Sequence, residues 1–285
     1  MRALLAAALL AAAPGAAARP GLNHVYVVLD QATFDAIRSD PRVAQLLGPN
    51  DGGLPDYAPP RADADRIFLR GRTTYLELFA PKNRFDEPVG KVGIALAEDR
   101  ARDFERLAKR WQGYCPYSYS RASVAWTRSQ PPIPWYDSVQ CAETAMRDDL
   151  SIWAMVYRPA FGRWQLGSPV TARRAILEPR TRAGQGRFDV TALELAVPRS
   201  LRTRVEQQLI AAGLTSARRG DTSVLTGRGW TITLRPTSNP AAVLTAIGMR
   251  VLSDQSSTLT VGSGRLSSGR LEATLRFHPA STPPR

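Results

Sequence analysis

A strand followed directly by a helix and then by further strands recurs along this chain, and this order constrains the fold most strongly. The first copy begins with a strand at 22–30, after which Asp30 can cap a helix. The second copy begins at 89–96 and the third at 188–197, and apolar residues at helical spacing follow each of these strands. We therefore expect an α+β fold with an internal repeat.

Composition divides these copies into two units. Residues 48–63 are rich in Gly, Pro and Asp and predict a loop, whereas 112–148 are aromatic and Pro-rich and predict an insertion with short strands. Residues 243–277 have strand-like patterning without a helix, so that any fourth copy is degenerate. The predicted organisation is a signal peptide at 1–18, a first domain at 19–177, a linker at 178–187, a second domain at 188–278 and a tail at 279–285.

The N-terminal residues have the pattern of a secretory signal peptide. Arg2 precedes a short Ala- and Leu-rich run at 3–13, a Pro-Gly pair ends the run, and small residues precede an expected cleavage site after Ala18. The run is too short to span a bilayer, and no later segment is apolar enough to do so. The sequence therefore predicts a periplasmic or secreted protein without a membrane span.

Export makes the two cysteines informative. An oxidising compartment favours a disulfide between Cys115 and Cys141. The alternative is a reactive thiol, for which the sequence offers no activating neighbour.

Charge and short motifs exclude several classes of function. The net charge is +13, but the arginines that dominate it are scattered and accompany no nucleic-acid-binding motif. A basic surface could attract anionic polymers or acidic ligands, although a simple solvated surface is the better interpretation. Neither a G-x-S-x-G nucleophile elbow nor a complete phosphate-binding glycine loop is present in the sequence.

One histidine and one glutamate are the candidate functional pair. His24 lies on the first strand, and Glu77 lies in the middle of the strand at 74–79. Side chains two residues apart share a face of a strand, so His24 is expected beside Tyr26, and Glu77 beside Tyr75. A histidine and a carboxylate on two strands can form half of a metal site, and the chain has only one other histidine, His278, near its end.

Three segments carry a resemblance to known proteins. Residues 22–34 (LNHVYVVLDQATF), 75–79 (YLELF) and 153–159 (WAMVYRP) resemble uncharacterised glyoxalase-like proteins of the glyoxalase/bleomycin-resistance, or vicinal oxygen chelate, superfamily. The resemblance covers 20–165 and extends to 187–236. It implies βαβββ modules paired into open barrels around a small-molecule cavity, in two tandem units of which the second is degenerate.

The resemblance also implies where a metal would bind. In metal-dependent members, each module of a pair offers one ligand from its first strand and one from its last. His24 and Glu77 occupy these positions in the first module, whereas Gly93 and Val156 occupy them in the second. Neither Gly93 nor Val156 can bind a metal, so half of the site is missing.

The same pairing predicts the lining of the cavity. We expect His24, Tyr26, Tyr75 and Glu77 to face it, together with Arg158, which shares the strand face of Val156. Aromatic walls with a few convergent polar groups suit a small polar or anionic ligand.

Three hypotheses follow. The leading one is an exported, metal-independent protein that binds a small molecule through His24 and Glu77 without a cofactor. The second is a lyase, isomerase or dioxygenase that uses a divalent metal at these two residues, and the third is an interaction module without a ligand. The aromatic residues of the insertion could form a sugar-binding platform, but we favour a packing role for them: Tyr114, Tyr117, Tyr119, Trp126, Trp135 and Tyr136.

Overall fold

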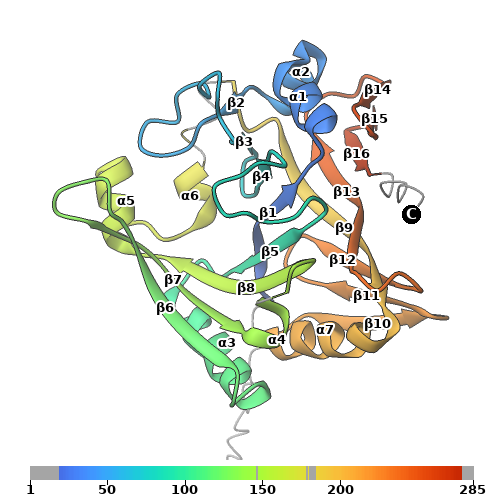
Figure 1. The fold of residues 1–285 in the computed structure, drawn as a ribbon. Helices are drawn as coiled ribbons and strands as arrows, with labels where there is room; N and C mark the ends of the chain where they lie inside the picture. Colours follow the sequence, from blue (N-terminus) through green and yellow to red (C-terminus); the bar gives the residue numbers. More distant parts are fainter. Residues whose placement is uncertain (1–18, 146, 178, 180–183, 278–285) are drawn as a thin grey trace, which may run out of the picture.

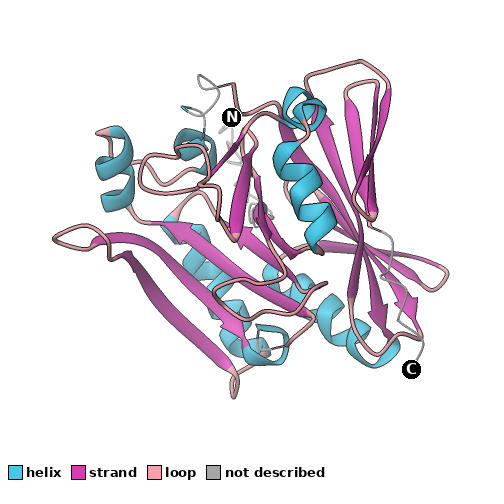
Figure 2. Cartoon of the chain, turned by 45° about the horizontal axis from the view of Figure 1, so that its top comes forward, coloured by secondary structure: helices cyan, strands magenta, loops and turns pink. Residues whose placement is uncertain are grey.

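The computed structural model describes residues 19–277 except 146, 178 and 180–183. Over these residues the chain forms two mixed β-sheets of eight strands each, with helices packed against them (Figures 1 and 2). Each sheet is built from two four-stranded modules, so the α+β class and the two tandem units are confirmed. Over the described residues neither sheet closes into a full barrel.

The first sheet contains the first two modules. Module one comprises β1 (Gly21–Val28), α1 (Gln31–Ser39), α2 (Pro41–Leu47), β2 (Asn50–Asp51), β3 (Arg66–Arg70) and β4 (Tyr75–Phe79). Module two comprises β5 (Val92–Ala97), α3 (Ala101–Tyr114), β6 (Tyr119–Trp126), β7 (Ile133–Cys141), α4 (Ala142–Ala145) and β8 (Leu150–Tyr157). Two short helices follow, α5 (Pro159–Leu166) and α6 (Arg173–Leu177). The strand order is β2-β3-β4-β1-β5-β8-β7-β6.

The second sheet repeats this arrangement. Module three comprises β9 (Phe188–Pro198), α7 (Arg199–Ala212), β10 (Thr215–Arg219), β11 (Thr222–Thr226) and β12 (Thr231–Thr237). Module four comprises β13 (Val243–Val251), β14 (Ser257–Val261), β15 (Gly264–Gly269) and β16 (Glu272–Arg276). The strand order is β10-β11-β12-β9-β13-β16-β15-β14.

Module four lacks a helix, and its three later strands run in the opposite directions to their counterparts in module two. In module two, α3 crosses back along the sheet, so that β8 runs parallel to β5. Residues 243–277 contain strands alone, each antiparallel to its neighbour, and β16 therefore runs antiparallel to β13. The fourth copy is thus degenerate in a definite sense: β14, β15 and β16 form antiparallel hairpins, β13 pairs with β16, and no helix connects β13 to β14.

The first helix begins as its sequence predicts. Asp30 is the N-cap of α1, and its carboxylate accepts hydrogen bonds from the backbone N–H of Thr33 at 2.9 Å and from the Thr33 hydroxyl at 2.7 Å. Pro41 begins a separate helix, α2, because proline suits the first turn of a helix but not its interior.

The two units share one continuous apolar core. Helix α3 packs on α7, where the fully buried Trp111 donates from Nε1 to the Gln208 carbonyl at 3.0 Å. On the other side, the β14–β15 turn docks on α1, and the Ser263 hydroxyl donates to Asp30 at 2.7 Å. The module that lacks a helix thus packs against the capped helix of module one.

The predicted disulfide is confirmed. Cys115 at the end of α3 and Cys141 at the end of β7 are bonded, with Cα atoms 6.0 Å apart. The predicted signal peptide, most of the linker and almost the whole tail lie outside the described residues. Among the described helices, none is long and apolar enough to cross a membrane.

Removal of this disulfide should destabilise the fold. The bridge closes a loop with a sequence separation of 26 residues. The chain-entropy model then gives a loss of about 3.5 kcal/mol in the free energy of unfolding for the double Cys115→Ala, Cys141→Ala variant. Urea denaturation of both proteins under non-reducing conditions measures this loss. The variant should also become insensitive to reductant, and equal stability of the two proteins would contradict the prediction.

Candidate functional site

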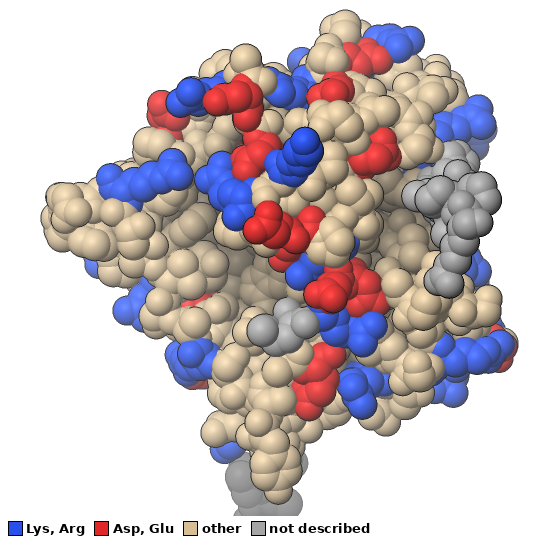
Figure 3. All heavy atoms as spheres, viewed as in Figure 1, with Lys and Arg blue, Asp and Glu red and all other residues tan. Residues whose placement is uncertain are grey.

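A cavity of about 330 Å³ opens on one face of the first sheet. Figure 3 shows the surface hollowed between the β6–β7 hairpin and module one, with basic side chains scattered among acidic ones around it. The cavity is lined mainly by aromatic side chains with a few charged ones: His24, Tyr26, Arg66, Tyr75, Glu77, Phe79, Phe85, Glu87, Trp135, Tyr136, Trp153, Met155 and Tyr157.

Strand register brings four of the predicted residues together. His24 on β1 is paired with Tyr75 on β4, and Tyr26 is paired with Glu77 in the next position on the same face. All four side chains line the cavity, as the period-two alternation predicted. Whether they bind a ligand stays a prediction.

The prediction of which face of β8 lines the cavity is wrong. Val156 is buried in the main core, and Trp153, Met155 and Tyr157 face the cavity instead. Arg158 does not line the cavity, because its side chain is half-exposed and pairs with Asp137 at 2.8 Å. Nearly every residue of β8 is buried, so the alternation of polar and apolar residues that would identify its inner face is absent.

His24 is buried as a neutral imidazole. Its ring stacks on Tyr75 with centroids 4.4 Å apart, and its Nδ1 lies 2.8 Å from the side-chain oxygen of Asn23. Burial lowers the pKa of His24 to about 3, and the positive charge of nearby Arg70 acts in the same direction. Since the Asn23 oxygen can only accept, Nδ1 carries the proton and Nε2 presents a lone pair toward Glu77.

Glu77 binds an arginine that the sequence did not reveal. Arg66 on β3 donates from Nη1 to Glu77 Oε1 at 2.8 Å, whereas Glu77 Oε2 lies 3.8 Å from His24 Nε2. The latter distance is too long for a hydrogen bond, so His24 and Glu77 face each other without being bonded. Burial raises the pKa of Glu77, although the charge and hydrogen bond of Arg66 oppose this shift.

A second arginine supports the wall behind this pair. Arg70 is buried and donates to Asp51 at 3.1 and 3.3 Å in a bidentate ion pair. Its guanidinium lies over Phe68 and Tyr75, with 4.2 and 4.5 Å to the two ring centroids. Tyr75 therefore packs against both Arg70 and His24.

A tyrosine ring occupies the space in which the sequence resemblance places the first metal ligand of module two. Gly93 on β5 pairs with Tyr26, and a Cβ atom built at Gly93 would overlap the Tyr26 ring. The Tyr26 hydroxyl donates to Glu87 at 3.3 Å, and Glu87 pairs with Lys91 at 2.9 Å. The ring is thus fixed at its tip while its body covers the glycine.

These residues do not fit the divalent metal that the sequence resemblance implies. Among the described residues, no three of His, Cys, Asp and Glu are grouped closely enough to hold a metal ion. On the cavity face of module two, β5 offers Gly93 and Ala95, and β8 offers Trp153 and Met155 beside Ser151. Arg66 also competes for the Glu77 carboxylate, and catalytic zinc sites normally have three protein ligands.

The inner surface of β3 could have been predicted from its alternation. Ile67 and Leu69 point into the core, so Arg66, Phe68 and Arg70 must share the opposite face. Only the register between strands, which pairs Arg66 with Phe79 and Phe68 with Glu77, shows that this face borders the site.

The aromatic insertion forms the outer wall of the cavity. Trp135 packs edge-on against Trp126 and Tyr136, and Phe161 from α5 contacts Trp135 with ring centroids 5.8 Å apart. The Trp135 Nε1–H is buried without a hydrogen-bond partner, although Trp135 lines the cavity. Packing accounts for most of this cluster.

Sequence comparison places the chain in a family without an assigned function. Residues 22–274 match the model of a family described as "Family of unknown function (DUF5829)", and the chain belongs to this family. No curated protein matches the sequence.

Solved structures show a similarity of fold. A hypothetical protein from Staphylococcus aureus has a TM-score of 0.53 at 8% identity, covering 84% of this chain and 94% of that protein. A mutant 4-hydroxymandelate synthase from Streptomyces coelicolor has a TM-score of 0.41 at 13% identity, covering 80% and 69%. BphC, a halotolerant catechol dioxygenase, has a TM-score of 0.44 at 9% identity, covering 88% and 83%. The first similarity concerns the fold alone, and the other two carry no argument about function.

The buried imidazole should make stability depend on pH. His24 has a folded-state pKa of about 3 and an ordinary value of 6.5, so between these values the unfolded chain binds a proton that the folded chain does not. Stability is therefore lost as the pH falls through this window. Compared with His24→Phe, wild type should lose about 2 kcal/mol of unfolding free energy between pH 7 and pH 5.

The matched variant isolates this contribution. Phenylalanine can keep the stacking on Tyr75, and the opposing contribution of Glu77 is common to both proteins. Urea denaturation at each pH measures the difference. Parallel stability curves for the two proteins would show that His24 is not buried as a neutral group.

Adding a methyl group at Gly93 should displace Tyr26. We expect Gly93→Ala to cost about 1–3 kcal/mol of unfolding free energy, as for other overpacked sites. In a Tyr26→Ala background the same substitution should cost less, because the ring that it would strike is gone. A double-mutant cycle by urea denaturation checks this coupling, and an unchanged cost in the second background would contradict it.

Proposed function

We propose that this member of the DUF5829 family binds a small, flat, polar molecule in the cavity around His24 and Glu77, without a resident metal. The observation that carries the proposal is a cavity with aromatic walls in which a neutral imidazole and a carboxylate face each other without being bonded. Its volume, about 330 Å³, lies in the range of small-molecule sites.

The polar atoms suggest the chemistry of the ligand. The His24 Nε2 lone pair and Glu77 Oε2 are acceptors, so the ligand should present a hydrogen-bond donor between them. The Arg66 guanidinium is a donor, so another edge of the ligand should carry an acceptor or a negative charge. Such a donor–acceptor molecule fits the predicted class of a polar or anionic ligand, and stacking favours a planar ring.

We also propose export and a place in the vicinal oxygen chelate superfamily for the chain. Export is supported by the bonded Cys115–Cys141 pair, since disulfides persist in oxidising compartments. The superfamily is supported by the order of the modules and by the pairing of their first strands, β1 with β5 and β9 with β13.

Ligand binding should depend on the two inward-facing side chains. Small heteroaromatic compounds with both a donor and an acceptor would be screened by thermal shift, and those that bind would be titrated by calorimetry. For such a compound we expect His24→Ala and Glu77→Gln to raise the Kd about tenfold or more, because each removes a buried hydrogen-bonding group.

Arg158→Ala is the matched control, because Arg158 lies outside the cavity and should leave the Kd unchanged. Compounds that bind the wild type and both cavity variants equally would overturn the assignment of the site. Circular dichroism of each variant excludes global unfolding as the cause of a weaker Kd.

Metal analysis separates this proposal from a metal-dependent lyase, isomerase or dioxygenase. Protein purified without chelator should contain substoichiometric metal, and EDTA should leave ligand binding unchanged. One equivalent of Mn, Fe, Ni or Zn in the wild type that is lost in His24→Ala would support the enzyme instead.

A further inference from the structure

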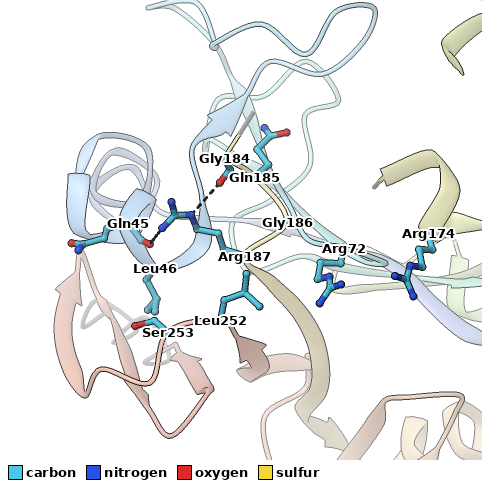
Figure 4. A pocket seen from close by; sticks show the side chains of 10 residues that line it. All are labelled: Gln45, Leu46, Arg72, Arg174, Gly184, Gln185, Gly186, Arg187, Leu252 and Ser253. Carbon is cyan, nitrogen blue, oxygen red and sulfur yellow. Dashed lines mark hydrogen bonds between the residues drawn. The ribbon is translucent and has the colours of Figure 1, made fainter. Parts of the chain in front are cut away.

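A second cavity lies where the two units meet, and we propose that it binds an amphiphilic anion, a carboxylate or phosphate group attached to a short apolar chain. Its volume is about 460 Å³, and it shares no lining residue with the His24 cavity. Figure 4 shows its lining: Gln45, Leu46, Arg72, Arg174, Gly184, Gln185, Gly186, Arg187, Leu252 and Ser253.

All the charged residues that line this cavity are basic. Arg72 comes from the β3–β4 turn, Arg174 from α6 and Arg187 from the residue before β9, and none of the lining residues is acidic. In Figure 4 the side chains of Arg72 and Arg174 are drawn on the right of the cavity and that of Arg187 on the left. Three guanidinium groups from distant segments around one cavity attract an anion.

Two of these arginines keep their charge available. Arg187 donates from Nη1 to the Gln45 carbonyl at 2.8 Å and from Nε to the Gly184 carbonyl at 3.2 Å. Both acceptors are uncharged, so the guanidinium is positioned without being neutralised. The backbone N–H of Arg72 is anchored on the Phe188 carbonyl at 3.0 Å, and within the described residues its side chain forms no ion pair.

The same cavity has an apolar side. Leu252 is 62% exposed, and it lines the cavity with Leu46. The Leu252 backbone N–H donates to the Arg187 carbonyl at 2.9 Å, which fixes the apolar and basic groups next to each other. A bare inorganic anion would leave Leu252 in water, whereas an apolar chain beside the anionic group would cover it.

A ligand bound in this second cavity would contact both units. The lining residues come from α2, the β3–β4 turn and α6 on one side, and from the segment before β9 and the segment after β13 on the other. A ligand that contacts both sides binds the folded protein in preference to the unfolded chain, and it should raise the melting temperature.

The proposal is tested with four probes on the full chain: hexyl phosphate, hexanoate, inorganic phosphate and hexanol. Thermal shift and calorimetry should detect hexyl phosphate or hexanoate, and whichever binds more tightly identifies the anionic group. Inorganic phosphate and hexanol should bind at least tenfold more weakly, because each lacks one of the two recognised parts.

Substitutions then locate the binding. Arg72→Ala should raise the Kd of the better probe about tenfold or more, Arg72→Lys should restore part of the affinity, and Leu252→Ser should weaken binding of the six-carbon probes but not of inorganic phosphate. Arg219→Ala removes an exposed arginine from the edge strand β10 and should change nothing. His24→Ala should also leave binding unchanged, so this test is independent of the proposed function.

Two results would overturn the proposal. One is a wild-type protein that binds neither hexyl phosphate nor hexanoate at millimolar concentration. The other is binding that Arg72→Ala and Arg219→Ala weaken equally, because affinity would then follow net charge rather than this cavity. Arg72→Lys, which keeps the charge and the backbone anchor, distinguishes lost recognition from misfolding.

Discussion

The antiparallel pairing of β1 with β5 is the contact on which the rest of the first unit depends. It joins two four-stranded modules into one sheet, and it leaves neither first strand with an unpaired edge. Because β4 flanks β1 and β8 flanks β5, the same pairing places Glu77 and Trp153 on either side of His24. The cavity is therefore a product of register, and no single module contains it.

The second unit is also joined by antiparallel pairing of the first strands of its two modules, but one of these modules has no helix. β9 pairs with β13 as β1 pairs with β5, but module four has no helix of its own to cover its strands. The β14–β15 turn packs on α1 instead, where the Ser263 backbone N–H donates to the Thr33 hydroxyl at 3.0 Å beside the Asp30 cap. Helix α1 thus contacts both units, and α3 joins them on the other side through its packing on α7.

Local signals in the sequence were sufficient for some features and not for others. The Asp30 cap, the repeat and the shared face of His24 and Tyr26 follow from spacing along one segment, and all three are present. The face of β8 that lines the cavity could not be predicted, because a strand buried on both faces shows no alternation of polar and apolar residues. The roles of Arg66 and of the arginines of the second cavity depend on contacts between distant segments, which the spacing along a single sequence does not reveal.

The misfit between the first cavity and a divalent metal involves more than one side chain. Gly93 lacks a ligand, but the Tyr26 ring also occupies the space in which one would stand. Glu77 keeps its charge partner in Arg66, so a metal would have to displace an ion pair as well as bind a carboxylate. Since Asn23 holds the Nδ1 proton, what remains is an Nε2 lone pair beside a carboxylate inside an aromatic wall. That arrangement is suited to recognising a hydrogen-bond donor or accepting a proton from a bound molecule.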